Sequence, residues 1–150
     1  MEEYKPDIVY FSFTRKYFAG QLIRIFNNGD FENDLYRDFT YIDDVIEGVE
    51  RLLNNPPEGE EVPHRIFNIG NNNPEKLKTF IETLENALSK ALGREVVFEK
   101  IFEPMKPGDV PVTYASTRLL EEAVGFKSHT SIKEGLQRFA DWYVEYYNVK

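Results

Sequence analysis

In the stretch YRDFTYIDDVIEGVERLL, residues 36–53, an arginine and three aspartates flank a short aromatic segment. Arg37 and Asp38 stand before that segment, and Asp43 and Asp44 stand after it. Four kinds of chemistry use such residues: a metal site, a catalytic acid pair, a clamp on a phosphate, and the capping of a helix. The elements that these residues flank decide among the four.

The acid pair stands where a predicted strand over residues 37–42 gives way to a predicted helix over residues 43–54. Either Asp43 or Asp44 can be the N-cap while the other lies in the first turn, where carboxylates accept free backbone amides and oppose the helix dipole favourably. A hard cation would need several further oxygen ligands, and no calcium-loop spacing occurs. We therefore predict that the pair caps the helix and binds no metal.

Arg37 follows a loop rich in Asn and Gly, residues 27–34, and stands at the very start of the predicted strand. A guanidinium group binds phosphate oxygens in a bidentate manner, which makes arginine a natural clamp for a diphosphate. The alternative is a surface ion pair with Asp38 or Asp34, an arrangement that is common and contributes little. The residues alone leave both interpretations open.

The segment MKPGDVP, residues 105–111, supplies a second pair of candidates, Lys106 and Asp109, with Gly108 between them. An ammonium group can oppose a phosphate, and a carboxylate three residues later can accept hydrogen bonds from ribose hydroxyls. The alternative is a solvated loop that its prolines hold in shape.

Composition excludes several other kinds of site. The chain has no cysteine, and its two histidines, His64 and His129, lie far apart, which argues against disulfides, zinc-thiolate sites and histidine triads. No G-x-G-x-x-G fingerprint, P-loop or G-x-S-x-G elbow occurs. The sequence therefore predicts no catalytic residue and no cofactor-binding residue in this chain.

The overall charge and hydropathy exclude some classes of partner and indicate a cellular compartment. A formal net charge of −8 argues against nucleic acid and against anionic membrane surfaces as partners. No apolar run approaches the roughly 20 residues of a membrane span, and no signal peptide opens the chain. We expect a cytoplasmic protein.

Hydrophobic periodicity and turn residues predict the element order α-β-β-α-β-α-β-α-α. The predicted elements are a helix ending at Gly20, strands over 21–26 and 37–42, a helix over 43–54, a strand over 65–70, a helix ending at Gly93, a strand over 95–102, a loop over 103–116, and two helices capped by Ser116 and Ser131. This order is typical of an α/β fold with mixed α+β character. No linker divides the chain, so residues 1–150 are predicted to form a single unit.

Several of these segments together resemble successive blocks of the nucleotide-sugar epimerases. They are YKPDIVYFSFTRKYFAGQLIRIFNNGD, RDFTYIDDVIEGVERLL, RIFNIGNNNPEKLKTFIETLE, PMKPGDVPVTYAST and VGFKSHTSIKEGLQRFADWYVEYY. These enzymes are extended short-chain dehydrogenases/reductases, and the resemblance is to the UDP-glucuronate 4-epimerase group in particular. It covers nearly the whole chain but only the C-terminal, substrate-binding half of such an enzyme.

The resemblance implies a chain without the N-terminal Rossmann half, which in the family binds NAD and carries the catalytic tyrosine and lysine. The chain is then expected to be the UDP-sugar-binding part of an NAD-dependent UDP-glucuronate or UDP-glucose 4-epimerase, inactive by itself, with NAD needed only in a complete enzyme. The alternative is a non-catalytic interaction module, or a gene remnant, that has lost ligand binding.

The resemblance also implies roles for five residues. Phe26 would lie against the uracil ring, Arg37 would contact the diphosphate, Lys106 would stand at a second phosphate-contact position, and Asp109 would bind the ribose. Lys5 falls where the glucuronate epimerases have arginine in a GRPD motif. Two further departures from the family are an insertion, FEND, over 31–34, and Ser116 in place of an aspartate.

The missing half has a physical consequence. In the family, the strand over 65–70 belongs to the Rossmann sheet, so here it would lose its neighbours, as would the apolar face of the helix over 43–54. Uncovered apolar edges and faces favour association. We therefore expect a homo-oligomer, or a separate N-terminal half as partner.

Overall fold

The computed structural model describes residues 8–27, 29, 31, 34–59 and 63–150. In chain order its elements are α1 (Val9–Phe18), β1 (Ile23–Phe26), β2 (Tyr36–Arg37), α2 (Ile42–Leu53), β3 (Glu75–Lys76), α3 (Leu77–Leu92), β4 (Lys100–Glu103), β5 (Val112–Thr113), α4 (Arg118–Val124) and α5 (Ile132–Tyr147). The α/β class with mixed character that the sequence predicts is confirmed. No helix in the described part of the chain is long and apolar enough to cross a bilayer.

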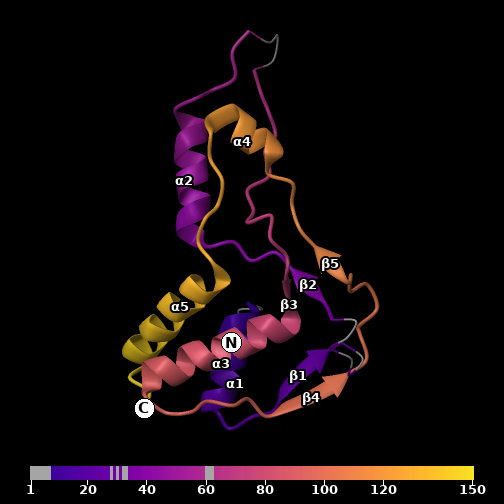
Figure 1. Cartoon of the computed structure of the whole chain (residues 1–150), viewed down its shortest axis with the longest axis vertical. Helices are drawn as coiled ribbons and strands as arrows, with labels where there is room; N and C mark the ends of the chain where they lie inside the picture. Colours follow the sequence, from indigo (N-terminus) through magenta and orange to yellow (C-terminus); the bar gives the residue numbers. More distant parts are fainter. Residues whose placement is uncertain (1–7, 28, 30, 32–33, 60–62) are drawn as a thin grey trace, which may run out of the picture.

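The strands of the described residues form two small sheets (Figure 1). In the first, β1 pairs with β4 in parallel, so that Phe26 lies opposite Glu103. In the second, β2 lies between β3, to which it is antiparallel, and β5, to which it is parallel. The loop from Glu103 to Pro111 links the two sheets.

The lower part of the molecule in Figure 1, hereafter the body, consists of α1, α3, α5 and the β1–β4 sheet. Its helices bury an apolar core against β1 and the segment before β4, with Ile23 and Ile25 on the inward face of β1. Phe80 of α3 is fully buried and stacks on Phe39 at 4.6 Å between ring centroids. The core members that are themselves buried are Phe13, Ile23, Ile25, Phe80, Ile81, Leu84, Ala87, Leu88, Val96, Phe98, Leu136 and Ala140.

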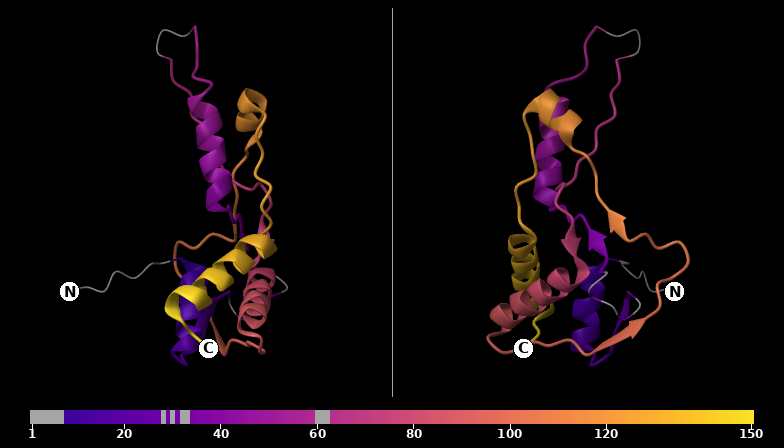
Figure 2. Two further views of the ribbon diagram at one scale, coloured as in Figure 1. Left: turned by 90° about the vertical axis from the view of Figure 1, so that its left-hand side faces the viewer. Right: turned by 45° about the vertical axis from the view of Figure 1, so that its right-hand side comes forward.

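The upper part, hereafter the arm, consists of α2, α4 and the segment 63–70, and it projects away from the body (Figures 1 and 2). Phe126, just after α4, packs against α2 where Gly48 leaves room, because a Cβ atom at Gly48 would lie 3.2 Å from the Phe126 ring. Arg51 lies over the same ring at 5.3 Å and donates to the Gly125 carbonyl. A few contacts therefore join the two helices of the arm.

The predicted helices are confirmed, and their ends differ from the structure by one or two residues. Gly20, Gly93 and Gly125 follow helices with positive φ angles of 64°, 65° and 63°, the left-handed geometry that glycine adopts without a steric penalty. Ser131 is the N-cap of α5, as predicted, and accepts the Glu134 amide at 3.2 Å. Ser116 does not cap α4, because the N-cap is Thr117, and no side-chain capping bond forms there.

The predicted strands fare less well. The strand predicted over 37–42 is wrong beyond Arg37, because only Tyr36 and Arg37 find partners in β3 and β5, and Phe39 turns inward onto the body core. The strand over 65–70 is also wrong: this segment pairs with no strand among the described residues, and Ile66 is 82% exposed. β4 occupies only the end of the strand predicted over 95–102. The short β5 lies inside the region predicted to be a loop.

Candidate functional site

The parallel pairing of β1 and β4 places the carboxyl ends of both strands together. Phe26 ends β1, and Glu103 opposite it ends β4, so the loop that follows Glu103 starts beside Phe26. The loop ends at Pro111, whose carbonyl accepts the Tyr36 amide at 2.8 Å as β5 joins β2. One loop therefore connects the position of Phe26 with the position of Arg37.

A tight turn in this loop holds Lys106 and Asp109 together. The Asp109 amide donates to the Lys106 carbonyl at 3.1 Å, with Pro107 second in the turn and Gly108 third at φ +93°. Proline followed by a residue with positive φ is typical of a type II turn. The Asp109 carboxylate also accepts the Lys106 amide at 3.3 Å, which closes the turn from its other end.

The turn brings the Lys106 side chain back to β1. Its Nζ atom lies 4.2 Å from the centroid of the Phe26 ring. Phe26 is half-buried, and both Lys106 and Asp109 are exposed. Three of the residues that the resemblance selects thus lie at one corner of the molecule, although they come from positions about 80 residues apart.

Arg37 lies at the other end of the same loop. Its Nη1 atom donates to the Tyr36 carbonyl at 2.8 Å and is 3.4 Å from the Pro111 carbonyl. The alternative of a surface ion pair with Asp38 or Asp34 is not found, since no such ion pair occurs among the described residues. Both acids bind backbone amides instead.

Those two acids are residues whose roles the sequence did not reveal. Asp34 is buried and accepts the Leu35 amide at 2.9 Å and the Lys78 amide at 2.7 Å, so it satisfies the first turn of α3, whose own N-cap, Lys76, forms no side-chain capping bond. Asp34 belongs to the FEND insertion, and the rest of that insertion lies largely outside the described residues. An acid before a strand is visible in the sequence, but the residue of α3 that Asp34 binds, Lys78, lies 44 residues later, so no local pattern reveals the contact.

Asp38 occupies the amides that a phosphate-binding loop would need. It accepts the amides of Asn72 at 3.0 Å and Asn73 at 3.4 Å. A Cβ atom on the preceding Gly70 would come within 3.0 Å of the same carboxylate. A phosphate would meet a negative charge here, so this turn does not fit the pyrophosphate of NAD.

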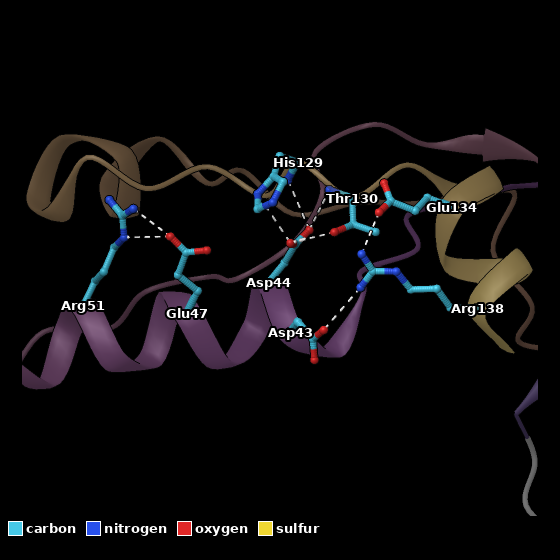
Figure 3. A network of polar contacts seen from close by, with 8 residues as sticks. All are labelled: Asp43, Asp44, Glu47, Arg51, His129, Thr130, Glu134 and Arg138. Atoms are coloured by element: carbon cyan, nitrogen blue, oxygen red, sulfur yellow. Dashed lines mark hydrogen bonds and ion pairs between the residues drawn. The ribbon is translucent and has the colours of Figure 1, made fainter. Parts of the chain in front are cut away.

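The acid pair at the start of α2 does not cap the helix, so that prediction is wrong. The N-cap is Tyr41, without a side-chain capping bond, and both acids lie in the first turn. Asp44 is 2% exposed and accepts the His129 amide at 3.1 Å, the Thr130 amide at 3.0 Å and the Thr130 hydroxyl at 2.8 Å (Figure 3). A segment remote in sequence outcompetes the helix amides, and Asp44 thereby ties the arm to α5.

Asp43, by contrast, stays at the surface. Its carboxylate lies 3.4 Å from Arg138, which also pairs with Glu134 at 2.7 Å and lies over the Tyr41 ring at 5.1 Å (Figure 3). Contact with Tyr41, followed by the charge of Glu134, raises the pKa of Arg138. Each carboxylate in this network is matched by a donor, and in the described part of the chain no three acidic or histidine side chains gather as a metal site.

Lys5, the fifth predicted site residue, lies outside the described residues, and its role stays a prediction. The cluster of Phe26, Arg37, Lys106 and Asp109 combines an aromatic face, two cations and a carboxylate at one loop. Such a set matches a nucleotide in chemistry: a base to stack, phosphates to neutralise and a ribose to hydrogen-bond.

Comparisons with known proteins agree with the sequence resemblance. The chain is 38% identical over 157 residues to a probable UDP-glucuronate 4-epimerase from Rhizobium meliloti (strain 1021), covering 95% of this chain and 43% of that protein. It is 36% identical over 151 residues to UDP-glucuronate 4-epimerase 1 from Arabidopsis thaliana, covering 95% of this chain and 34% of that one. The chain is a homologue of the UDP-glucuronate 4-epimerases. No protein-family model matches it.

Solved structures of epimerases share the fold. UDP-glucuronic acid 4-epimerase from Bacillus cereus, in complex with UDP-glucuronic acid and NAD, superimposes with a TM-score of 0.73 at 24% identity, over 95% of this chain and 41% of that chain. The match lies in the C-terminal half of such structures, as predicted. The chain spans less than half the length of each of these epimerases.

Proposed function

We propose that this chain is the UDP-sugar-binding part of an NAD-dependent UDP-glucuronate or UDP-glucose 4-epimerase and that it is inactive by itself. One observation carries the proposal: the residues that the family resemblance assigns to uracil, ribose and diphosphate lie on or beside a single loop. Lys106 contacts the Phe26 ring at 4.2 Å, Asp109 shares its turn, and Arg37 lies 3.4 Å from the loop's last carbonyl.

The geometry divides the labour among these side chains. Phe26 offers a ring for the base, since nucleobases stack on aromatic faces. Arg37 retains N–H donors beyond Nη1 for phosphate oxygens, and Lys106 adds a second positive charge. Asp109 keeps one carboxylate oxygen beyond its bond to the Lys106 amide, and that oxygen is suited to ribose hydroxyls.

Inactivity follows from what the sequence lacks. Epimerisation by transient oxidation needs a hydride acceptor, and the chain has no dinucleotide fingerprint to bind one. Its Tyr-x-x-x-Lys spacing, Tyr146 and Lys150, spans the end of α5 at Tyr147, so the two residues do not lie on one helix. We therefore expect no epimerase activity with UDP-glucuronate or UDP-glucose when NAD is added. Product formation by the purified chain would refute this part of the proposal.

Binding is tested by titrating UDP into the labelled protein and following two-dimensional amide NMR spectra. Localised shifts at Phe26, Arg37 and the 104–111 loop are expected, with weak affinity because the rest of the pocket lining is absent. Arg37→Ala should weaken UDP binding at least about tenfold, since hydrogen bonds to charged groups are among the strongest. Arg118→Ala, an exposed arginine on α4, is the matched control and should leave binding unchanged.

The rival function is a non-catalytic interaction module that keeps the fold without the ligand. A well-dispersed spectrum that ignores millimolar UDP, or an Arg37→Ala variant that binds as well as the parent, would favour this rival. Because Arg37 is only half-buried, its loss should not unfold the chain, and a thermal melt of the variant checks that assumption.

We also propose that the arm is covered by another polypeptide in use, either a second copy or a separate N-terminal half. The support is the row of exposed apolar residues along α2: Ile42, Ile46, Val49 and Leu53. Light scattering at high concentration should show a dimer or larger species, and Ile46→Glu should shift it towards monomer. A parent chain that stays monomeric would contradict the homo-oligomer and leave the second kind of partner.

A further inference from the structure

The Lys106 side chain lies where a stacked base would lie. Its ammonium is 4.2 Å from the Phe26 centroid, well within the range of a favourable cation–π contact. A ring face holds one occupant at this distance, so a base that stacks on this face must replace the ammonium. The aromatic platform is therefore covered by a residue of the same site.

The contact can be released without disturbing the loop. The two hydrogen bonds that close the turn involve the Lys106 backbone, at 3.1 Å and 3.3 Å, and not its side chain. No carboxylate lies within ion-pair distance of the ammonium among the described residues, and Glu103, three residues earlier, pairs with Arg24 at 3.6 Å. A lysine stem is flexible, so its charge can move while its backbone stays in place.

We infer that Lys106 makes the site selective for nucleoside phosphates over uncharged nucleosides. In the free protein the ammonium covers Phe26 and competes with any base. A diphosphate draws the ammonium off the ring, and the base then stacks on the vacated face. A nucleoside without phosphate must displace the ammonium unaided. This inference rests on the proposed function and adds to it a preference for phosphorylated ligands.

The test compares uridine with UDP as ligands of the parent chain and of Lys106→Ala. Loss of the competing ammonium should tighten uridine binding roughly two- to fivefold, the equivalent of an exposed cation–π contact. Loss of the phosphate contact should weaken UDP binding. The ratio of UDP affinity to uridine affinity should therefore fall, because the first decreases while the second increases. Lys76→Ala is the matched control, because Lys76 lies over the Tyr36 ring at 5.9 Å, outside the loop, and should change neither affinity.

A direct readout follows the Lys106 side-chain methylene resonances. Ring current from Phe26 should shift them upfield in the free parent relative to a Phe26→Leu variant. Saturating UDP should move them to the position seen in Phe26→Leu, because the side chain has left the ring. UDP that binds without moving these resonances would overturn the inference.

The two proposals fail in different ways. If the parent binds UDP while Lys106→Ala leaves uridine affinity unchanged, or weakens both ligands, Lys106 is a plain contact residue, and the inference fails while the proposed function stands. If the parent binds neither ligand at millimolar concentration, the proposed function fails and the inference fails with it.

Discussion

The body and the arm are built from helices of similar apolar content, yet only the body buries its apolar face. In α3, Phe80, Leu84 and Leu88 are fully buried against α5 and the β1–β4 sheet. In α2, Ile42, Ile46 and Leu53 face solvent, and Leu53 is 76% exposed. Figure 2 shows α2 beside α4 in the projecting arm, whereas α3 lies beside α5 in the body.

This difference shows that an amphipathic pattern states how much surface a helix must bury but not which polypeptide covers it. The body contains the partners for its own stripe within this chain. The described residues of the arm lack such partners, and the chain spans less than half the length of its relatives. The candidate site belongs to the body side of this division, because β1 and β4 position Phe26 and the loop.

The sharpest test of the comparison deletes the same side chain in each region. Leu84→Ala should lower the free energy of unfolding by about 2–5 kcal/mol, since it opens a cavity in a closed core. Leu53→Ala should change it by less than about 0.5 kcal/mol, because that side chain is already in water. Urea titrations of both variants measure the two values.

Similar losses in the two variants would mean that Leu53 is covered in solution. That result would indicate association through the arm, and it should then depend on protein concentration. A small loss at Leu84 would instead mean that the body core is loosely packed, which would undo the contrast between the two regions.

The next largest effect is expected at the junction between arm and body. Asp44→Ala removes the acceptor of two backbone amides and one hydroxyl, and each buried group left unpaired costs about 1–3 kcal/mol. Asp43→Ala removes only an exposed ion pair at 3.4 Å, worth about 0–1 kcal/mol. Chemical denaturation of the adjacent pair of variants separates the two roles. Equal losses of stability in the two variants would mean that Asp44, like Asp43, forms only a weak surface interaction.

A smaller effect distinguishes the caps of the last two helices. Ser131→Ala should cost about 0.5–2 kcal/mol, because the Ser131 hydroxyl accepts the Glu134 amide at the start of α5. Ser116→Ala should cost nothing measurable, since Thr117 is the N-cap of α4 and no side-chain capping bond forms. Thermal melts under identical conditions compare them. A loss at Ser116 equal to that at Ser131 would restore the cap that the sequence predicted there.

The helices could be predicted from the sequence because their signals are local. The stripe in α3, the glycines after three helices and the Ser131 cap all act within a turn or two of the chain. The strands could not be predicted, because strand pairing depends on partners that are remote in sequence. β2 contains only Tyr36 and Arg37, because β5 pairs with these two residues and no further. The segment 65–70 has the composition of a strand, but no strand in the described part of the chain pairs with it.

The geometry of the candidate site could not be predicted from the sequence, and the roles of its residues stay a prediction. The resemblance selects Phe26, Arg37, Lys106 and Asp109; the fold brings the first, third and fourth together and puts Arg37 beside the other end of the same loop. No pattern in the sequence shows that Lys106 covers Phe26, since that contact spans 80 positions along the chain. The same limit misled the prediction for Asp44, whose partners lie 85 and 86 residues away and outcompete the local amides.

The smallest predicted effect is on the pH dependence of stability, which reports how well the body excludes water from Tyr143. Burial, followed by the neighbouring charge of Tyr147, raises the pKa of Tyr143 above its ordinary value of 10.0. The folded state then holds this proton at a pH where the unfolded state releases it, so stability is complete below about pH 10 and falls as pH rises further. Tyr143→Phe should flatten that alkaline fall, whereas Tyr146→Phe, an exposed residue one turn on, should not. Unfolding free energies between about pH 9 and 11 measure the slopes. Identical slopes in parent and Tyr143→Phe would mean that water reaches this phenol, and that the body is less closed at its α1–α5 face than around Leu84.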